Sequence, residues 1–380
     1  MVEKVKKKIL IFSHGMEIGG AERALLGMLE LIDYDEYDVD LFLMRHCGEL
    51  LKYIPERVNL LPEMKAYSCL AVPILDVLKK GEFGVFFGRV FGKFYAKYRV
   101  KKLGLPGDNG VGLEYSHKFT KKFMPEINSK KYDVAISYLT PHYFVQENVN
   151  ADFKVAWIHT DYSKVAVDVV SELKMWGCYD RIVSISEAVT QTFLSVFPSL
   201  CDKVSIFENQ MAKECILKQV NELDVSSEMV EDGSIKLLSV GRFCHAKNFD
   251  NVPEICSRIL KCGLNVRWYL IGFGGGEDLI RSKIKEYHME DFVIVLGKKE
   301  NPYPYMQACD VYVQPSRYEG NAVTVHEAQF LNRPVIITNY STSSSQLERD
   351  KEGYIVPMDN EGCAKGIVEV LEKKKDSYEN

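Results

Sequence analysis

The chain contains 380 residues, of which 46% are hydrophobic and 27% are charged, and its formal net charge at pH 7 is −5. This length exceeds what one hydrophobic core usually organises, so we expect two domains of ordinary globular composition. The negative net charge gives no general reason to expect a nucleic-acid partner. The ten cysteines include no CxxC pair, which leaves no signal for a metal site or a disulfide framework, so we expect reduced thiols in a cytoplasmic protein.

The first predicted element is the apolar stretch ILIF at residues 9–12, which follows a basic cluster. It is too short for a membrane span or a secretory signal and predicts a strand. Further short apolar runs follow, separated by helical or irregular stretches, as parallel βαβ units require. The two series of predicted strands lie within 9–14, 39–44, 132–138, 154–159 and 181–186, and within 235–241, 266–272, 292–297, 310–315, 334–339 and 353–357.

A polar segment without strand patterning, residues 208–234, separates the two series. We therefore predict an N-terminal domain over 1–208 and a C-terminal domain over 209–360. The remaining residues, 361–380, predict a final helix that can pack back on the N-terminal domain.

Two adjacent glycines, Gly19 and Gly20, stand between the first predicted strand and the helix that follows it. Glycines here let the backbone approach a phosphate or a sugar, and a helix N-terminus adds partial positive charge. A Gly-Gly pair is also common in a simple tight turn, and this is not the GxGxxG dinucleotide pattern. Both interpretations stay open at this point.

Residues 79–102 concentrate eight Lys or Arg side chains with a single acidic one. On a helix, Phe91 and Phe94 belong to an aromatic face, and Arg89, Lys93 and Lys97 form a basic stripe on another face. Such a helix suits the surface of an anionic membrane. The alternative is an ordinary amphipathic helix packed on the first domain, and a nucleic-acid surface is the third interpretation.

Three further positions follow predicted strands. His159 ends the strand 154–159, where a lone histidine is either a structural hydrogen-bonding group or a functional one. Arg242 and Lys247 follow the first strand of the second domain, where a planar fork and a point charge could converge on one diphosphate. They could equally be two solvated cations on a loop.

Two glutamates, Glu319 and Glu327, lie where the strand 310–314 gives way to a helix predicted over 323–330. A strand-to-helix turn aims backbone N–H groups at a ligand above the sheet, so we expect an anionic or hydroxyl-rich ligand. If the helix began at Glu319, the two carboxylates would lie roughly 80° apart around its axis. The alternative is a helix-dipole acid plus a solvated surface acid.

The stretch around these glutamates resembles the donor-binding motif of retaining glycosyltransferases of family four, which have the GT-B fold. The matching residues are Glu319, Gly320, Glu327, Ala328, Pro334 and Val335, whereas Asn321, Ala322 and Thr324 depart from the usual pattern. Two further matches, G-G-A-E at 19–22 and G-R-x-x-x-x-K at 241–247, occur in family order. The resemblance implies an α/β protein of two Rossmann-like domains facing each other across a cleft.

The resemblance also implies a role for each matching residue. Glu327 would bind the donor ribose, and Glu319 the sugar hydroxyls with help from backbone amides. Arg242 and Lys247 would neutralise the diphosphate, and His159 would contact the sugar in the transition state. The other implied donor-site positions are Gly19, Gly20, Gly272, Gly320, Asn321, Ala322 and Val323.

The implied reaction is the metal-independent, retaining transfer of a hexose or N-acetylhexosamine from a nucleotide sugar, with a UDP-sugar as the expected donor and no other cofactor. The acceptor would be a glycan or a lipid-linked oligosaccharide in bacterial capsule, exopolysaccharide or wall-polymer synthesis. We expect a cytoplasmic protein that can be peripheral on the inner face of the membrane. The alternatives are a nucleotide-sugar epimerase of the same fold and a non-catalytic sugar-nucleotide binding protein.

Overall fold

The computed structural model describes residues 5–106, 109–319 and 322–379, without the side chains from 375 onward. The chain divides into two compact units, Met1–Ala212 and Lys213–Asn380. The sequence placed the boundary between 208 and 209. Each unit has its own sheet and its own hydrophobic core.

The first unit is built on a seven-stranded parallel sheet with the order β3-β2-β1-β4-β5-β6-β7. Its strands are β1 (Lys7–Ser13), β2 (Tyr37–Leu43), β3 (Asn59–Leu60), β4 (Tyr132–Ser137), β5 (Ala151–Ile158), β6 (Arg181–Ser184) and β7 (Val204–Ile206). The five strands predicted here are confirmed. The sequence missed β3 and β7, because elements of two and three residues are too short to show a periodic pattern.

The second unit has a six-stranded parallel sheet with the order β10-β9-β8-β11-β12-β13. Its strands are β8 (Ile235–Val240), β9 (Val266–Ile271), β10 (Val293–Gly297), β11 (Val311–Gln314), β12 (Val335–Thr338) and β13 (Gly353–Val356). All six predicted strands are confirmed. Both sheets follow the doubly wound order in which strands are added outward in two directions from a central pair.

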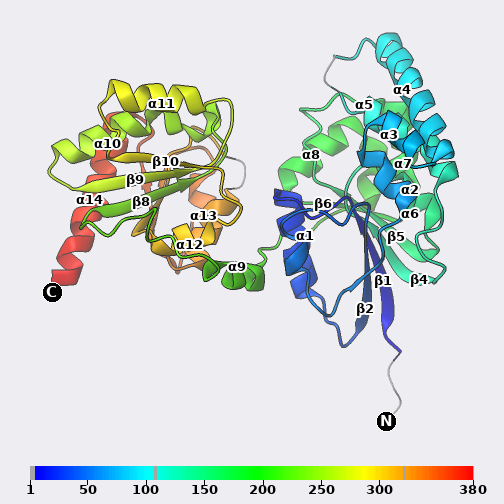
Figure 1. Cartoon of the computed structure of the whole chain (residues 1–380), viewed down its shortest axis with the longest axis horizontal. Helices are drawn as coiled ribbons and strands as arrows, with labels where there is room; N and C mark the ends of the chain where they lie inside the picture. The colour runs from blue at the N-terminus through cyan, green and yellow to red at the C-terminus, as the bar shows by residue number, and fades with distance from the viewer. Residues whose placement is uncertain (1–4, 107–108, 320–321, 380) are drawn as a thin grey trace. The chain divides into compact units, whose positions relative to one another are not determined.

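Helices connect the strands in both units (Figure 1). Those of the first unit are α1 (Gly20–Leu31), α2 (Lys65–Ser68), α3 (Ile74–Lys79), α4 (Phe83–Leu103), α5 (Val111–Thr120), α6 (Tyr143–Asn148), α7 (Val169–Gly177) and α8 (Glu187–Val196). Those of the second are α9 (Lys213–Val220), α10 (Val252–Lys261), α11 (Glu277–Glu286), α12 (Tyr303–Ala308), α13 (Val323–Phe330) and α14 (Asn360–Glu379). In the second unit, α10 and α11 cover one face of the sheet and α12 and α13 the other.

The final helix, α14, packs on α10 and β13 of its own unit. Cys363, Ile367 and Leu371 point from it into the core of that unit, where they are buried. Whether α14 also reaches the first unit concerns the placement of the two units, so that expectation stays a prediction. Across the described residues, no helix combines the length and the apolar character needed to cross a membrane.

The doubly wound order fixes where each sheet can hold a ligand. The strand order reverses between β1 and β4 in the first unit and between β8 and β11 in the second. At such a reversal the two connections leave in opposite directions, which opens a crevice beyond the carboxyl ends of the strands. The loops after these four strands are therefore where functional side chains are expected.

Candidate functional site

In the second unit, the loop after β8 and the loop after β11 are fastened to each other. The backbone N–H of Arg317 donates to the carbonyl of Ala246 at 2.8 Å. The guanidinium of Arg317 makes two hydrogen bonds to the Asp250 carboxylate, at 2.9 and 2.7 Å. A bidentate pair of this kind fixes orientation as well as distance. The two loops therefore act as one platform at the strand-order reversal.

The platform brings two predicted site residues into direct contact. Lys247 Nζ lies 2.6 Å from Glu319 Oε1, and both side chains are largely buried, at 18% and 10% exposure. Gln314 and Ser316 donate to the same carboxylate oxygen. Within the part of the chain that the structure describes, no donor reaches Glu319 Oε2. One oxygen of this carboxylate is thus held in place by three donors, and the other can accept a hydrogen bond from a ligand.

The local backbone explains why Lys247 reaches this position. Asn248, directly after it, has a left-handed backbone with φ of 60°, a conformation that asparagine tolerates better than most residues. Its buried amide donates to the Pro315 carbonyl at 2.9 Å, which ties the turn to the second loop. A Cβ atom at Gly241 would lie 3.1 Å from Lys247 Cε, so glycine leaves room for the lysine stem.

Arg242, the other predicted cation, lies on the same loop but is exposed. Among the residues described, no acidic side chain pairs with its guanidinium. The loop after β8 therefore carries one cation that is held by a carboxylate and one that is free to meet an anion.

The glycine-rich turn after β9 packs closely against the loop that carries Arg242. A Cβ atom at Gly272 would lie 1.9 Å from the Gly241 carbonyl oxygen, so only glycine fits there. The backbones of the two loops are also joined, because Phe243 N–H donates to Phe273 O and Gly276 N–H donates to Phe243 O, both at 2.9 Å. This close backbone contact gives Gly272 a structural reason to be glycine.

Glu327 lies on α13, where it is buried and accepts a hydrogen bond at 2.8 Å from the hydroxyl of Tyr303 on α12. Because α13 begins at Val323, four residues after Glu319, the two glutamates do not share a helix. The 80° relationship, which required a helix starting at Glu319, is therefore wrong. The helix itself, predicted over 323–330, is confirmed.

Only some of the backbone amides predicted to contact the sugar belong to the described residues. Gly320 and Asn321 lie outside the described residues. The N–H of Ala322 donates to Gln346 Oε1 at 2.7 Å, so a ligand would have to displace that side chain to reach it. Val323 is 42% exposed at the first position of α13.

In the first unit, Gly19 precedes α1 and Gly20 is its first residue. A Cβ atom at Gly19 would lie 2.1 Å from Glu22 Oε2, so the carboxylate of Glu22 folds back over the glycine. Burial, with the charge of Glu17 as a smaller cause, raises the pKa of Glu22. Nothing lies within 4 Å of a Cβ atom at Gly20, so that position is open.

His159 follows β5 with its ring against Tyr138, at 4.5 Å between ring centroids. Burial lowers the pKa of His159 to about 4, so its imidazole is neutral at pH 7. Its buried Nε2 has no hydrogen-bond partner among the described residues. The nitrogen is thus available to a ligand or a water molecule.

Three more histidines, which the sequence analysis missed, accompany His159 in the first unit: His117 and His142 are buried, and His14 is half-buried, like His159 itself. His14 follows β1, His142 follows β4, and His117 on α5 lies 6.3 Å from His14 between ring centroids. Burial lowers the pKa of His14 to about 4 and of His117 to about 3, and it lowers the pKa of His142 well below its usual value. Each ring has one buried nitrogen without a partner in the described chain.

The position of His14 and His142 gave a signal that could have been used. Both follow the strands between which the order of the first sheet reverses, just as His159 follows β5. These four rings make a neutral lining at the carboxyl edge of the sheet. Among the described residues, no group of three or more His, Cys, Asp or Glu is arranged to hold a metal ion.

Two Rossmann-like units in one chain are what the GT-B architecture comprises, and the predicted α/β class with two Rossmann-like domains is confirmed. Residues 221–380 match the family described as "Glycosyl transferases group 1". The second unit of the chain is thus similar to this family, as the motifs indicated.

Relatives agree with this assignment. This chain is 29% identical to the N-acetylgalactosamine-N,N'-diacetylbacillosaminyl-diphospho-undecaprenol 4-alpha-N-acetylgalactosaminyltransferase of Campylobacter jejuni. The match extends over 174 residues, which are 44% of this chain and 47% of that relative. The chain thus spans about half the length of that relative. It is 20% identical to the UDP-Gal:alpha-D-GlcNAc-diphosphoundecaprenol alpha-1,3-galactosyltransferase of Escherichia coli, over 94% of this chain and 86% of the relative.

Among solved structures, HepE of Anabaena in complex with UDP has the same fold. The TM-score is 0.58 at 14% identity, over 97% of this chain and 90% of HepE.

Proposed function

We propose that this protein is a retaining, metal-independent glycosyltransferase that moves a hexose or N-acetylhexosamine from a UDP-sugar to a glycan or lipid-linked oligosaccharide. Its setting would be bacterial surface-polysaccharide synthesis at the cytoplasmic face of the membrane. The observation that carries the proposal is the Lys247–Glu319 pair at the strand-order reversal of the second unit, beside the unpaired Arg242.

The cations act on the leaving diphosphate. Arg242 presents a free guanidinium, and Lys247 exchanges its contact with Glu319 for one with the phosphate oxygens. Transfer of the sugar leaves negative charge on the nucleoside diphosphate, and preplaced cations stabilise that charge more in the transition state than in the bound donor. The rate gain in this mechanism is mainly electrostatic.

Glu319 acts on the sugar. When Lys247 turns to the diphosphate, Gln314 and Ser316 still hold one carboxylate oxygen. The other oxygen accepts from sugar hydroxyls, and its negative charge stabilises the developing oxocarbenium-like ring. Backbone N–H groups at the start of α13 complete this part of the donor site, and the expected contacts of Gly320 and Asn321 lie outside the described residues.

Glu327 binds the ribose hydroxyls of the donor. Its carboxylate is held by Tyr303, so it is positioned before the donor arrives. Gly272 contributes by keeping the loop of Arg242 in place.

The first unit contributes His159 to the transferred sugar and the Gly19–Gly20 turn to the diphosphate. A neutral imidazole with an unpartnered buried nitrogen can hydrogen-bond a sugar hydroxyl without adding charge.

The comparisons support the proposal for donor and acceptor. HepE was crystallised with UDP, and the Campylobacter and Escherichia relatives act on glycans linked to diphosphoundecaprenol. For this chain, a UDP-sugar and a lipid-linked acceptor are therefore the first substrates to test.

Product analysis tests the proposal. With UDP-sugars and lipid-linked acceptors, we expect UDP release that depends on the acceptor, and a product whose anomeric configuration by NMR equals that of the donor. An inverted product would contradict the retaining mechanism. A nucleotide sugar that is converted without acceptor and without UDP release would identify an epimerase, and binding without any turnover would identify a non-catalytic binding protein.

A further inference from the structure

Helix α4 carries a stripe of aromatic side chains that the fold leaves uncovered. The stripe consists of Phe83, Phe87, Phe91, Phe94 and Tyr98, which are 54–68% exposed. Their spacing of three and four residues places them along one side of the helix. A single exposed apolar residue is common on protein surfaces, but a contiguous row of five aromatic rings marks an interaction surface.

The opposite side of α4 is already fixed to the first unit. Its small residues Gly88, Gly92 and Ala96 are buried, and a Cβ atom at Gly92 would lie 2.6 Å from the Tyr115 carbonyl on α5. Arg99 pairs with the buried Asp168 at 2.6 Å, which ties the helix to the start of α7. Because this side is close-packed, α4 cannot turn to bury its aromatic stripe.

Arg89 belongs to this fixed side and not to the basic stripe on which the sequence placed it. Its guanidinium donates to the carbonyls of Cys69 and Val72, at 2.7 and 2.6 Å. It therefore holds the segment before α3 against the helix. This contact leaves Arg89 outside the exposed basic surface of α4.

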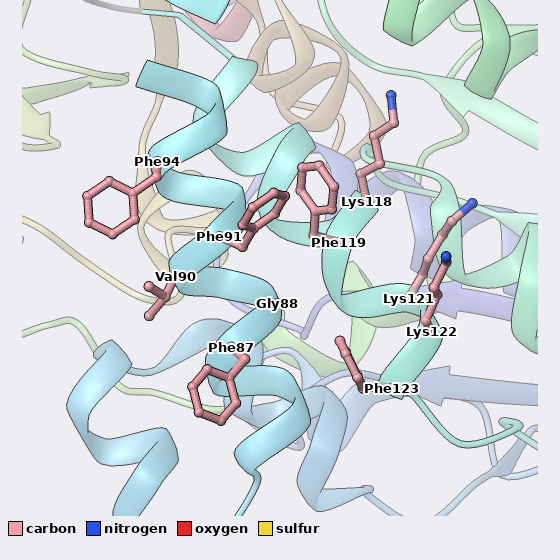
Figure 2. Close-up of a pocket in the computed structure, with 10 residues that line it drawn as sticks. All are labelled: Phe87, Gly88, Val90, Phe91, Phe94, Lys118, Phe119, Lys121, Lys122 and Phe123. Carbon is pink, nitrogen blue, oxygen red and sulfur yellow. The ribbon is translucent and has the colours of Figure 1, made fainter. Parts of the chain in front are cut away.

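An apolar groove runs beside the stripe, between α4 and the segment 118–123 (Figure 2). Phe87, Phe91 and Phe94 project from α4, and Phe119 and Phe123 from the facing segment. The rings of Phe91 and Phe119 meet edge to face, at 4.7 Å between centroids. The groove has a volume of about 640 Å³, large enough for part of a hydrocarbon chain.

The surroundings of the groove are cationic. Lys93, Lys97, Lys101 and Lys122 are exposed, and within the described chain none of them pairs with a carboxylate. Helix α4 contains no acidic residue. Two other lysines at the groove are already engaged, Lys118 with Ser171 and Lys121 with Glu147. The surface thus offers unpaired positive charge beside exposed aromatic rings.

We propose that the aromatic stripe of α4, its groove and these four lysines dock the protein on an anionic lipid surface. The rings would enter the headgroup region and the lysines would meet lipid phosphates, as in other basic aromatic helices at interfaces. A second copy of the chain is a poorer occupant, because a symmetric contact through this surface would oppose lysine to lysine. This inference goes beyond the proposed transferase activity and does not depend on it.

Vesicle flotation of the full chain tests the docking surface. We expect binding to vesicles containing phosphatidylglycerol, weaker binding as salt is raised, and little binding to phosphatidylcholine alone. Changing Lys93, Lys97 and Lys101 to Glu should weaken binding about 100-fold, since each basic residue near the surface contributes a factor of about five. The matched control changes Lys218, Lys285 and Lys373 of the second unit to Glu, with the same change in net charge and wild-type binding expected.

The apolar part of the surface has its own variants. Changing Phe91 and Phe94 to Ser should weaken binding at least about 10-fold, whereas changing the exposed Leu217 and Leu279 to Ser should not. All three native tryptophans are buried, so Phe94→Trp adds an exposed reporter. We expect its fluorescence to shift to the blue on anionic vesicles and to be quenched by lipids with brominated chains.

Three results would overturn the inference. The first is equal binding of the wild type to vesicles with and without phosphatidylglycerol. The second is wild-type binding by both the triple lysine variant and the Phe91 and Phe94 variant. The third is fluorescence of the Phe94→Trp variant that brominated lipid does not quench. If the wild type instead forms a dimer in light scattering that the Phe91 and Phe94 variant abolishes, the surface belongs to a second copy. The reporter decides the matter even if a multiple variant unfolds, because it alters a single exposed side chain.

Discussion

The first six strands of each unit follow the same order, but the carboxyl edges of the two sheets differ in their chemistry. In the second unit, charged side chains hold one another, with Lys247 on Glu319 and Arg317 on Asp250. In the first unit, four histidines lie at the edge, two of them buried and two half-buried, each neutral and each with an unpartnered nitrogen among the described residues. One fold can therefore present a charged platform or a neutral lining, depending on the loops that follow its strands.

This difference agrees with the two separate binding tasks in the proposed reaction, the diphosphate in the second unit and the sugar in the first. A diphosphate requires cations that are already in place, and these occur in the second unit. Uncharged sugar hydroxyls can also be bound by hydrogen-bonding groups without net charge, and neutral imidazoles provide them. Each edge can be perturbed separately, so the comparison can be tested.

The largest effect is expected at the carboxylate of the charged edge. Glu319→Gln preserves size but removes the negative charge beside the developing sugar cation, so kcat should fall about 100-fold or more. Glu327→Gln is the matched variant and should mainly raise KM for the donor. Steady-state kinetics separate the two, and a normal kcat for Glu319→Gln would remove this residue from the mechanism.

A smaller effect, on the free energy of unfolding, is expected where the loop after β8 touches the turn after β9. Gly272→Ala would force a Cβ atom into the Gly241 carbonyl, which should lower the free energy of unfolding by about 2 kcal/mol or more. Gly275→Ala in the same turn meets no atom within 4 Å and should change it by no more than about 0.5 kcal/mol. Urea titration of both variants checks this, and equal midpoints would show that the loops do not constrain each other.

The smallest effect concerns the neutral edge and its response to acid. Histidines whose pKa is lowered in the folded state take up protons only after unfolding, so each weakens the fold as pH falls from about 6.5 to its folded value, near 4 for His14 and His159. The slope is at most about 1.4 kcal/mol per pH unit for each histidine. Glu172 opposes it, because burial raises the pKa of this carboxyl to about 7.

A single variant separates the contribution of one histidine from the total pH dependence of stability. In His159→Asn, unfolding should take up about one proton fewer between pH 6.5 and 5. The free energy of unfolding should therefore fall less steeply with decreasing pH than in the wild type. Melting temperatures over this pH range provide the test, and identical slopes for wild type and His159→Asn would mean that His159 is not buried as a neutral ring.

The sequence predicted eleven of the strands, the helix over 323–330 and the charged residues after β8 and β11, because these depend on local pattern and on a family motif. It could not predict that Arg89 bonds to the carbonyls of Cys69 and Val72, since that contact depends on how α4 packs. The same limit hid the histidine lining, whose members come from four separate segments. Amphipathic spacing on α4 was visible, but which of its faces would be buried was decided by Gly88 and Gly92.

The central claim is that the cations of the second unit hold the donor diphosphate, and titration calorimetry of the full chain with UDP tests it most directly. Arg242→Ala and Lys247→Ala should each weaken UDP binding about 30-fold or more, the effect of truncating a desolvated charge contact. Lys261→Ala, which removes an exposed lysine at the end of α10, is the matched control and should bind UDP like the wild type. If all four proteins bind UDP with equal affinity, the site assignment is contradicted.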